Sequence, residues 1–157
     1  MASEIERKFL VEVIPDWLED HESDEVRQGY LAISGDAEVR VREAGGSATL
    51  TVKRGHGRSR EETEIDLTDQ QFSRLWPGTE GRRVFKRRFK VPLDDELTAE
   101  VDVYSESLAG LCIVEVEFGG DEQADRFSEP AWFGEELTGN DEFTNQTLAV
   151  EGLPGGL

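Results

Sequence analysis

Charged residues recur at every second position in six short segments of the sequence, and in most of these segments the charges have the same sign. Carboxylates on one surface can share an oxygen-preferring ion such as Mg²⁺ or Mn²⁺, and closely spaced basic groups can hold a multiply charged anion. The spacing therefore indicates metal-assisted chemistry on a polyanion. The acidic members are Glu4, Glu6, Glu62, Glu64, Glu100, Asp102, Glu115 and Glu117, and the basic members are Lys8, Arg40, Arg42, Lys53, Lys86 and Arg88.

These charges are expected on one face of each strand, since residues i and i+2 of a β-strand point the same way. The positions between them are mostly apolar, as Val39 and Val41 are on either side of Arg40. One such strand alone is well explained by a sheet with a solvated face. A solvated face usually mixes the two signs, however, because neighbouring like charges repel each other. The repeated like-signed pairs favour a ligand-binding face.

The balance of these charges also suits a particular ligand. Eight acids and six bases leave a net charge of −2, which two divalent cations would change to +2. That remainder favours a triphosphate as the bound anion. A sheet closed into a barrel with its charged face inward would let opposite walls hold such an anion from several sides.

The elements that must position these residues are short alternating segments separated by clusters of Gly, Asp, Ser and Pro, which is typical of antiparallel β proteins. Thr68 and Gln71 form a capping-box pattern that predicts a helix start. The expected strands are 3–11, 26–33, 37–43, 47–54, 60–67, 82–91, 98–104 and 111–118, and the expected short helices are 69–76, 121–127 and 142–149.

The expected fold class is α+β, mainly β: an eight-stranded antiparallel closed barrel, or tunnel, with a charged interior. A few short helices are expected to cover its apolar outer face. We expect one domain over residues 1–151, a packed surface loop over 128–139 and a flexible tail over 152–157.

Composition excludes several classes of protein. The chain has 157 residues, 36% of them hydrophobic, and a net charge of −18, which disfavours nucleic acid and anionic membranes as partners. Cys112 is the only cysteine, so an intramolecular disulfide is excluded and a buried thiol is expected. Neither a long apolar run nor a secretion-signal pattern is present, so a cytoplasmic location is expected. The expected oligomeric state is a monomer or a homodimer.

Other catalytic patterns are missing from the sequence. His21 and His56 lie in polar segments and are expected to face solvent, and neither Ser59 nor Ser105 has a triad-like context. The glycine-rich loop of nucleotide-binding proteins is also absent. These observations disfavour a serine-nucleophile hydrolase and a P-loop enzyme.

The ordered set of charged segments resembles the CYTH domain family, also called triphosphate tunnel metalloenzymes, whose hallmark is an N-terminal E-x-E-x-K strand. Glu4, Glu6 and Lys8 match that hallmark. The resemblance is closest to short bacterial inorganic triphosphatases and implies an eight-stranded barrel with a polar tunnel. Further matches are Arg27-Gln-Gly-Tyr30, Arg40-Val-Arg42, Thr51-Val-Lys53, Glu80-Gly-Arg-Arg83 with Lys86 and Arg88, and Val114-Glu-Val-Glu-Phe118.

The resemblance implies roles for individual residues. Tyr30 would contact the C-terminal helix or position substrate, and Lys8, Glu62 and Glu64 are the expected catalytic residues. The cofactor would be Mg²⁺ or Mn²⁺. Phosphate oxygens would be held by Lys8, Arg40, Arg42, Lys53, Lys86 and Arg88, and the metal ions by Glu4, Glu6, Glu115 and Glu117, with Asp102, Glu62 and Glu64 as further candidates.

The activity implied by the resemblance is metal-dependent hydrolysis of a triphosphate, foremost inorganic tripolyphosphate to orthophosphate and pyrophosphate. The alternatives are a thiamine triphosphatase, an adenylate cyclase and a non-catalytic module that binds metal-polyphosphate. A cyclase is disfavoured because no cluster of aromatic, Asn or Gln residues is placed to recognise adenine. The last expected helix contains Phe143-Thr-Asn-Gln146 where close relatives have lysines, so a basic contact over the substrate is not expected there.

Overall fold

A computed structural model describes residues 5–55, 61–155 and 157 of the chain. Its eight strands form one sheet in the order β1-β8-β7-β6-β2-β3-β4-β5, and all seven neighbouring pairs are antiparallel. The expected eight-stranded antiparallel architecture is thereby confirmed. The strands are β1 Ile5–Leu10, β2 Ser23–Ser34, β3 Ala37–Ala44, β4 Ser47–Arg54, β5 Glu61–Leu67, β6 Arg83–Pro92, β7 Thr98–Tyr104 and β8 Cys112–Phe118.

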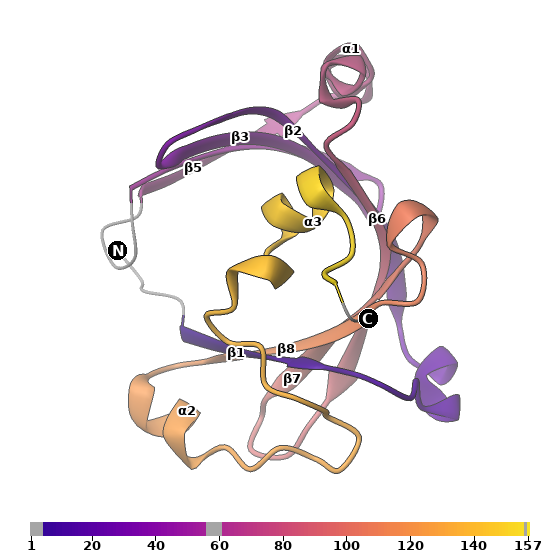
Figure 1. The fold of residues 1–157 in the computed structure, drawn as a ribbon, viewed down its shortest axis with the longest axis vertical. Helices are drawn as coiled ribbons and strands as arrows, with labels where there is room; N and C mark the ends of the chain where they lie inside the picture. Colours follow the sequence, from indigo (N-terminus) through magenta and orange to yellow (C-terminus); the bar gives the residue numbers. More distant parts are fainter. Residues whose placement is uncertain (1–4, 56–60, 156) are drawn as a thin grey trace.

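The sheet curves into a wall that encloses a concave side (Figure 1). Its pairing order ends at β1 and β5, so within the described residues the hydrogen-bonded ring is open between these two strands. Both strands carry carboxylates on their concave faces: Glu6 on β1, and Glu62 and Glu64 on β5. Like charges on the two edges oppose closer approach, which is consistent with an open ring.

The helices are short. They are α1 Asp69–Leu75, α2 Asp121–Arg126 and α3 Asn145–Glu151, with single 3₁₀ turns η1 Asp16–Asp20, η3 Trp76–Thr79, η4 Glu106–Leu108 and η5 Asp141–Phe143. The capping box at the start of α1 is confirmed, because Thr68 and Gln71 exchange side-chain to backbone hydrogen bonds. Within the described part of the chain, no helix is long and apolar enough to cross a membrane.

The C-terminal helix differs from its expected place. The segment predicted as 142–149 is divided into η5 and α3, because the Thr144 side chain caps α3 by accepting a hydrogen bond from Thr147 N. Figure 1 shows α3 on the concave side of the sheet, whereas we expected it on the outer face. The concave positions at this end of the strands are apolar, and Leu148 packs in one buried cluster with Val84 and Ile113. This apolar floor explains the position of α3.

The convex face of β1, β8 and β7 holds the largest buried cluster. Phe9 of β1 is fully buried and packs against Phe133 of the 128–139 loop at a ring-centroid distance of 5.0 Å. Cys112 lies in this cluster as a buried free thiol, as expected. The loop and α2 therefore form the cover of this half of the sheet.

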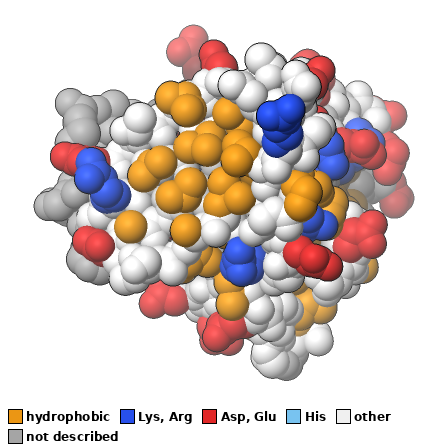
Figure 2. All heavy atoms as spheres, turned by 90° about the horizontal axis from the view of Figure 1, so that it is seen from above, with side chains coloured by type: hydrophobic (Ala, Val, Ile, Leu, Met, Phe, Trp, Pro, Cys, Tyr) orange, Lys and Arg blue, Asp and Glu red, His pale blue; other side chains and the backbone are white. Residues whose placement is uncertain are grey.

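The convex face of the other half is only partly covered. Phe72 of α1 packs on Val41 and Ala48 at one end of that face. Val39, Val52 and Ile65 lie farther along it, and Ile65 is 52% exposed. Figure 2 shows hydrophobic side chains gathered on the face of the molecule that is seen from above.

Candidate active site on the concave face

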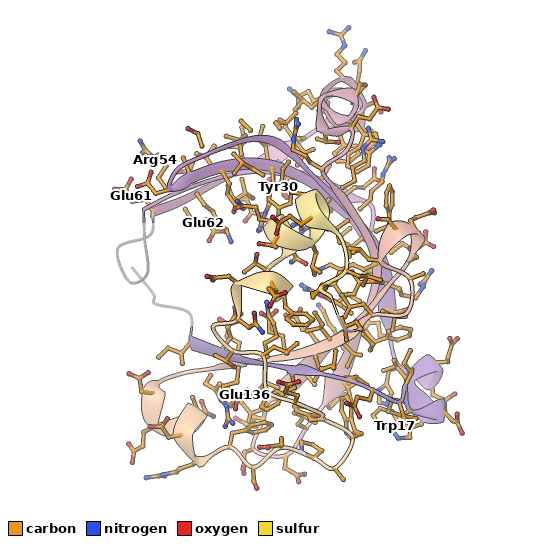
Figure 3. The ribbon with its side chains drawn as sticks, in the orientation of Figure 1. Trp17, Tyr30, Arg54, Glu61, Glu62 and Glu136 are labelled. Carbon is orange, nitrogen blue, oxygen red and sulfur yellow. The ribbon has the colours of Figure 1, made fainter. Side chains whose placement is uncertain are left out.

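The pairing order places the predicted site residues in a clear arrangement. Basic residues occupy the central strands of the concave face, Lys86 and Arg88 on β6 and Arg40 and Arg42 on β3. The acidic residues lie toward both edges, on β1, β8 and β7 at one side and on β5 at the other. Figure 3 shows Tyr30 and Glu62 on the concave side of the curved sheet. The face thus combines a cationic centre with two carboxylate-bearing edges.

An ion-pair network of Lys86, Asp102 and Arg88 forms one part of the centre. Lys86 Nζ donates to Asp102 Oδ2 at 2.8 Å. Arg88 grips the same carboxylate with two hydrogen bonds, Nε to Oδ1 at 2.7 Å and Nη2 to Oδ2 at 2.9 Å. Three donors therefore occupy both oxygens of a carboxylate whose side chain is only 8% exposed. Asp102 was expected to be a further metal ligand, and in the structure both of its oxygens accept hydrogen bonds from the two cations.

Burial and pairing shift the pKa values of this network. Burial lowers the pKa of Lys86 to about 8, even though the Asp102 charge acts in the opposite direction. Burial alone would raise the pKa of Asp102, but Lys86 and Arg88 outweigh it and hold that pKa at about 2. The carboxylate therefore stays ionised at neutral pH.

A second chain of contacts links β3 to β2. Arg42 Nε donates to Gln28 Oε1 at 2.6 Å, and Gln28 Nε2 donates to the Tyr30 hydroxyl oxygen at 2.8 Å. Gln28 and Tyr30 are 0% and 1% exposed. Burial raises the pKa of Tyr30, so its hydroxyl keeps its proton at neutral pH.

Gly29, between Gln28 and Tyr30, allows a close contact between β2 and η3. A Cβ on Gly29 would lie 2.5 Å from the side chain of Thr79, which is itself fully buried. Only glycine therefore allows η3 to pack directly against β2 here. Arg82 strengthens the same contact by donating to the carbonyl oxygens of Tyr30 and Gly78.

Arg40 has the least satisfied side chain of the centre. Its nearest carboxylate, Glu38 on the same strand, lies 3.7 Å from Nη1. Arg40 Nε is buried, and it is the only such side-chain nitrogen or oxygen without a hydrogen-bond partner among the described residues. Burial, followed by the charges of Arg40 and Arg88, lowers the pKa of Arg42 to about 10. Crowded cations and an unpartnered buried donor create a site that favours an anion.

The carboxylates of β1 and β8 face each other in register. Glu6 is directly opposite Glu117, and Lys8 is opposite Glu115, which in turn is opposite Glu100 of β7. Oxygen ligands of this type suit Mg²⁺ or Mn²⁺. No group of three or more His, Cys, Asp or Glu residues with metal-binding geometry occurs within residues 5–55, 61–155 and 157. Glu4 lies outside the described residues, as do His56 and Ser59.

At the opposite edge, β4 and β5 bring another predicted pair together. Lys53 is in register with Glu62, and Thr51 with Glu64. The two acids are exposed, whereas Thr51 is buried. In the pairing order, β5 and β1 are at opposite ends, so the sheet gives no direct contact between Glu62 and the Glu6 side of the face.

The C-terminal segment contributes to the same side of the sheet. Lys8 Nζ donates to the carbonyl oxygen of Phe143 at 3.4 Å, and Tyr104 donates its hydroxyl to Asn145 Oδ1 at 2.9 Å. Tyr30 was expected to contact the C-terminal helix or to position substrate. Its hydroxyl group interacts with the side chains of Gln28 and Arg40, and β2 and α3 are neighbours in the fold.

Sequence reasoning missed three residues of this face. Gln28, Glu38 and Tyr104 point to the same side as Tyr30, Arg40 and Asp102, respectively, since each lies two positions away on the same strand. Extending the period-two analysis from charged to neutral polar residues would have identified Gln28. Arg87 is outside this face, as expected, where it pairs with Glu25 at 2.9 Å.

Comparison with known proteins shows the family and the fold to which the chain is similar. A family model described as the CYTH domain matches residues 2–141. A protein of Nitrosomonas europaea described as an inorganic triphosphatase is 44% identical over 149 residues, which cover 94% of this chain and 97% of that protein. Another inorganic triphosphatase, from Acetivibrio thermocellus, is 33% identical over 151 residues and 94% of each chain.

A solved structure is similar over nearly the full length. The crystal structure of an inorganic triphosphatase matches with a TM-score of 0.78 and 41% sequence identity, and it covers 99% of both chains. At this identity and coverage, the similarity includes the strands that carry the basic centre as well as those that carry the carboxylates.

Proposed function

The chain belongs to the CYTH domain family, and from that premise we propose that it is a divalent-metal-dependent inorganic triphosphatase. Its substrate would be tripolyphosphate, and its products orthophosphate and pyrophosphate. The two relatives described as inorganic triphosphatases support this substrate. The basic centre supports it independently, because it offers closely spaced cations, as in Arg40 beside Arg42.

The observation that carries the proposal is the buried, unpartnered Nε of Arg40 beside Arg42. Leaving such a donor unsatisfied costs about 1–3 kcal/mol, which a phosphate oxygen would offset. The bidentate geometry of guanidinium groups suits phosphate oxygens. Arg40, Arg42 and Arg88 would hold the substrate, with Lys53 and Lys86 adding charge from the flanking strands.

Hydrolysis of tripolyphosphate needs little covalent work from the protein, since positioning and charge neutralisation supply most of the catalysis. The water oxygen forms a bond to a terminal phosphorus, the bridging P–O bond breaks, and the water proton passes to a phosphate oxygen or to solvent. Lys8 and the Tyr30 hydroxyl would donate to phosphate oxygens as charge shifts toward pyrophosphate. Glu62 and Glu64 would orient the attacking water.

Glu6, Glu115 and Glu117 would hold the divalent cation, since carboxylate oxygens suit such an ion and the three residues lie on two adjacent strands. Glu4, which lies outside the described residues, would complete this set. A bound Mg²⁺ or Mn²⁺ neutralises phosphate charge and lowers the pKa of a coordinated water. The protein would contribute these carboxylates as ligands of the ion.

A substrate panel tests the proposal. Purified protein is incubated with tripolyphosphate, thiamine triphosphate or ATP, each with Mg²⁺ or Mn²⁺, and released phosphate and cyclic AMP are measured. Preferred hydrolysis of tripolyphosphate is the expected result. Thiamine triphosphate as the preferred substrate would indicate an organic triphosphatase, and cyclic AMP would indicate a cyclase. Binding of tripolyphosphate without phosphate release from any compound would leave only a binding module.

A further inference from the structure

Gln28 is a neutral residue in the middle of the charged face, and nothing in its own chemistry binds metal or phosphate strongly. Its side chain is fully buried and uses both ends of its amide on site residues, Arg42 on β3 and Tyr30 on β2. Val26 lies two positions earlier on the same face, and its apolar side chain is also buried. Packing alone would not require a buried amide at residue 28.

The chemistry of its partners fixes which way the amide points. Arginine has donors and no acceptor, so the atom that faces Arg42 Nε must be the amide oxygen. The amide nitrogen therefore faces Tyr30 and donates to its hydroxyl oxygen. Because Tyr30 Oη accepts this bond, the phenol proton must point away from Gln28.

We propose that Gln28 is a positioning residue that holds Arg42 and directs the Tyr30 hydroxyl proton toward the bound anion. This inference rests on the proposed triphosphatase function. It adds that Gln28 sets the direction in which the Tyr30 hydroxyl group donates. An amide is suited to this position because it accepts from Arg42 and donates to Tyr30 at the same time. A carboxylate of the same shape can only accept.

Gln28→Glu separates these two tasks. The introduced carboxylate still accepts from Arg42 Nε, but it also draws the Tyr30 proton toward itself and away from the substrate. We expect kcat for tripolyphosphate to fall by roughly 10- to 100-fold, as expected when a transition-state donor is lost. Gln70→Glu, which adds the same charge at an exposed position of α1, is the matched control and should keep kcat within about twofold.

The double variant Gln28→Glu/Tyr30→Phe shows whether the two residues act together. If Gln28 acts through the Tyr30 proton, kcat of the double variant should be no more than about twofold below that of Tyr30→Phe alone. Losses in kcat that multiply in the double variant would overturn the proposal. A Gln28→Glu variant with the kcat of the wild type would also overturn the proposal. Because kcat is measured at saturating substrate, weaker binding caused by the added charge is read separately in KM.

A readout without turnover tests the geometry on its own. Hydrogen exchange of the Arg42 Nε–H group, followed by NMR and assigned with Arg42→Lys, should be slow in the wild type. It should stay slow in Gln28→Glu and become fast in Gln28→Leu. Slow exchange in all three would overturn the role of Gln28 even if the protein is an active triphosphatase. Absence of phosphate release by the wild type would instead refute the proposed function and leave this exchange test valid.

Discussion

The ammonium group of Lys86 lies 2.8 Å from Asp102 Oδ2, and the Lys86 side chain is completely excluded from solvent. Arg88 binds both oxygens of the same carboxylate. Strand β6 therefore supplies two cations, and the neighbouring strand β7 supplies the anion that pairs with them. Asp102 is thus the buried carboxylate shared by the two cations of β6.

Asp102→Asn should destabilise the protein strongly, because it removes the carboxylate charge that is paired with a fully buried ammonium group. Breaking a buried pair costs about 3–5 kcal/mol, and urea denaturation measures this loss. Glu25→Gln is the matched control, since it breaks an exposed ion pair with Arg87 on the convex side of β2 and β6. Its cost should stay below about 1 kcal/mol. Equal losses in the two variants would contradict the structural role given to Asp102.

The pKa of Lys86 predicts a dependence of stability on pH. This pKa is lowered from 10.5 to about 8, so between these values the unfolded chain binds a proton that the folded chain lacks. The contribution of Lys86 to stability therefore rises with pH in this window, by up to about 3 kcal/mol. The free energy of unfolding of the wild type, relative to Lys86→Met, should increase from pH 8 to pH 10.5. A difference that stays constant with pH would refute the lowered pKa.

Arg40→Met should weaken binding of tripolyphosphate by roughly 10- to 100-fold without reducing stability. The variant removes an unpartnered buried donor and one of several crowded cations, so the free energy of unfolding should stay equal or rise by about 1 kcal/mol. Calorimetric titration and urea denaturation measure the two effects. Arg87→Met, on the convex face, is the control for loss of a positive charge. Unchanged affinity in Arg40→Met would argue against an anion at this position.

Glu117→Gln should raise the Mg²⁺ concentration needed for half-maximal activity by roughly tenfold, since one of the two carboxylates that face each other across β1 and β8 loses its charge. Activity measured over a range of Mg²⁺ concentrations provides the test. Glu25→Gln, on the convex face, should leave the requirement unchanged. The same requirement in Glu117→Gln and the wild type would remove Glu117 from the metal-binding set.

Local pattern was sufficient to predict much of the fold and which charged side chains share a strand face. Alternation at every second residue separated Arg40 and Arg42 from Val39 and Val41, and the strand register confirms that division. The capping box at Thr68 identified the start of α1 within one residue. These features depend on interactions between residues close in sequence, so the sequence reveals them directly.

The sequence by itself determined which side chains share a face, but only the tertiary structure decided which of them are neighbours. Strand pairing places β6 beside β2 and β7, and it thereby brings Asp102 within hydrogen-bond distance of Lys86 and Arg88. It also leaves an apolar floor on the concave side, which α3 covers through Leu148. Parity along a strand is a local property, whereas neighbours across strands follow from pairing between distant segments. The residues that lie opposite each carboxylate are set by that pairing.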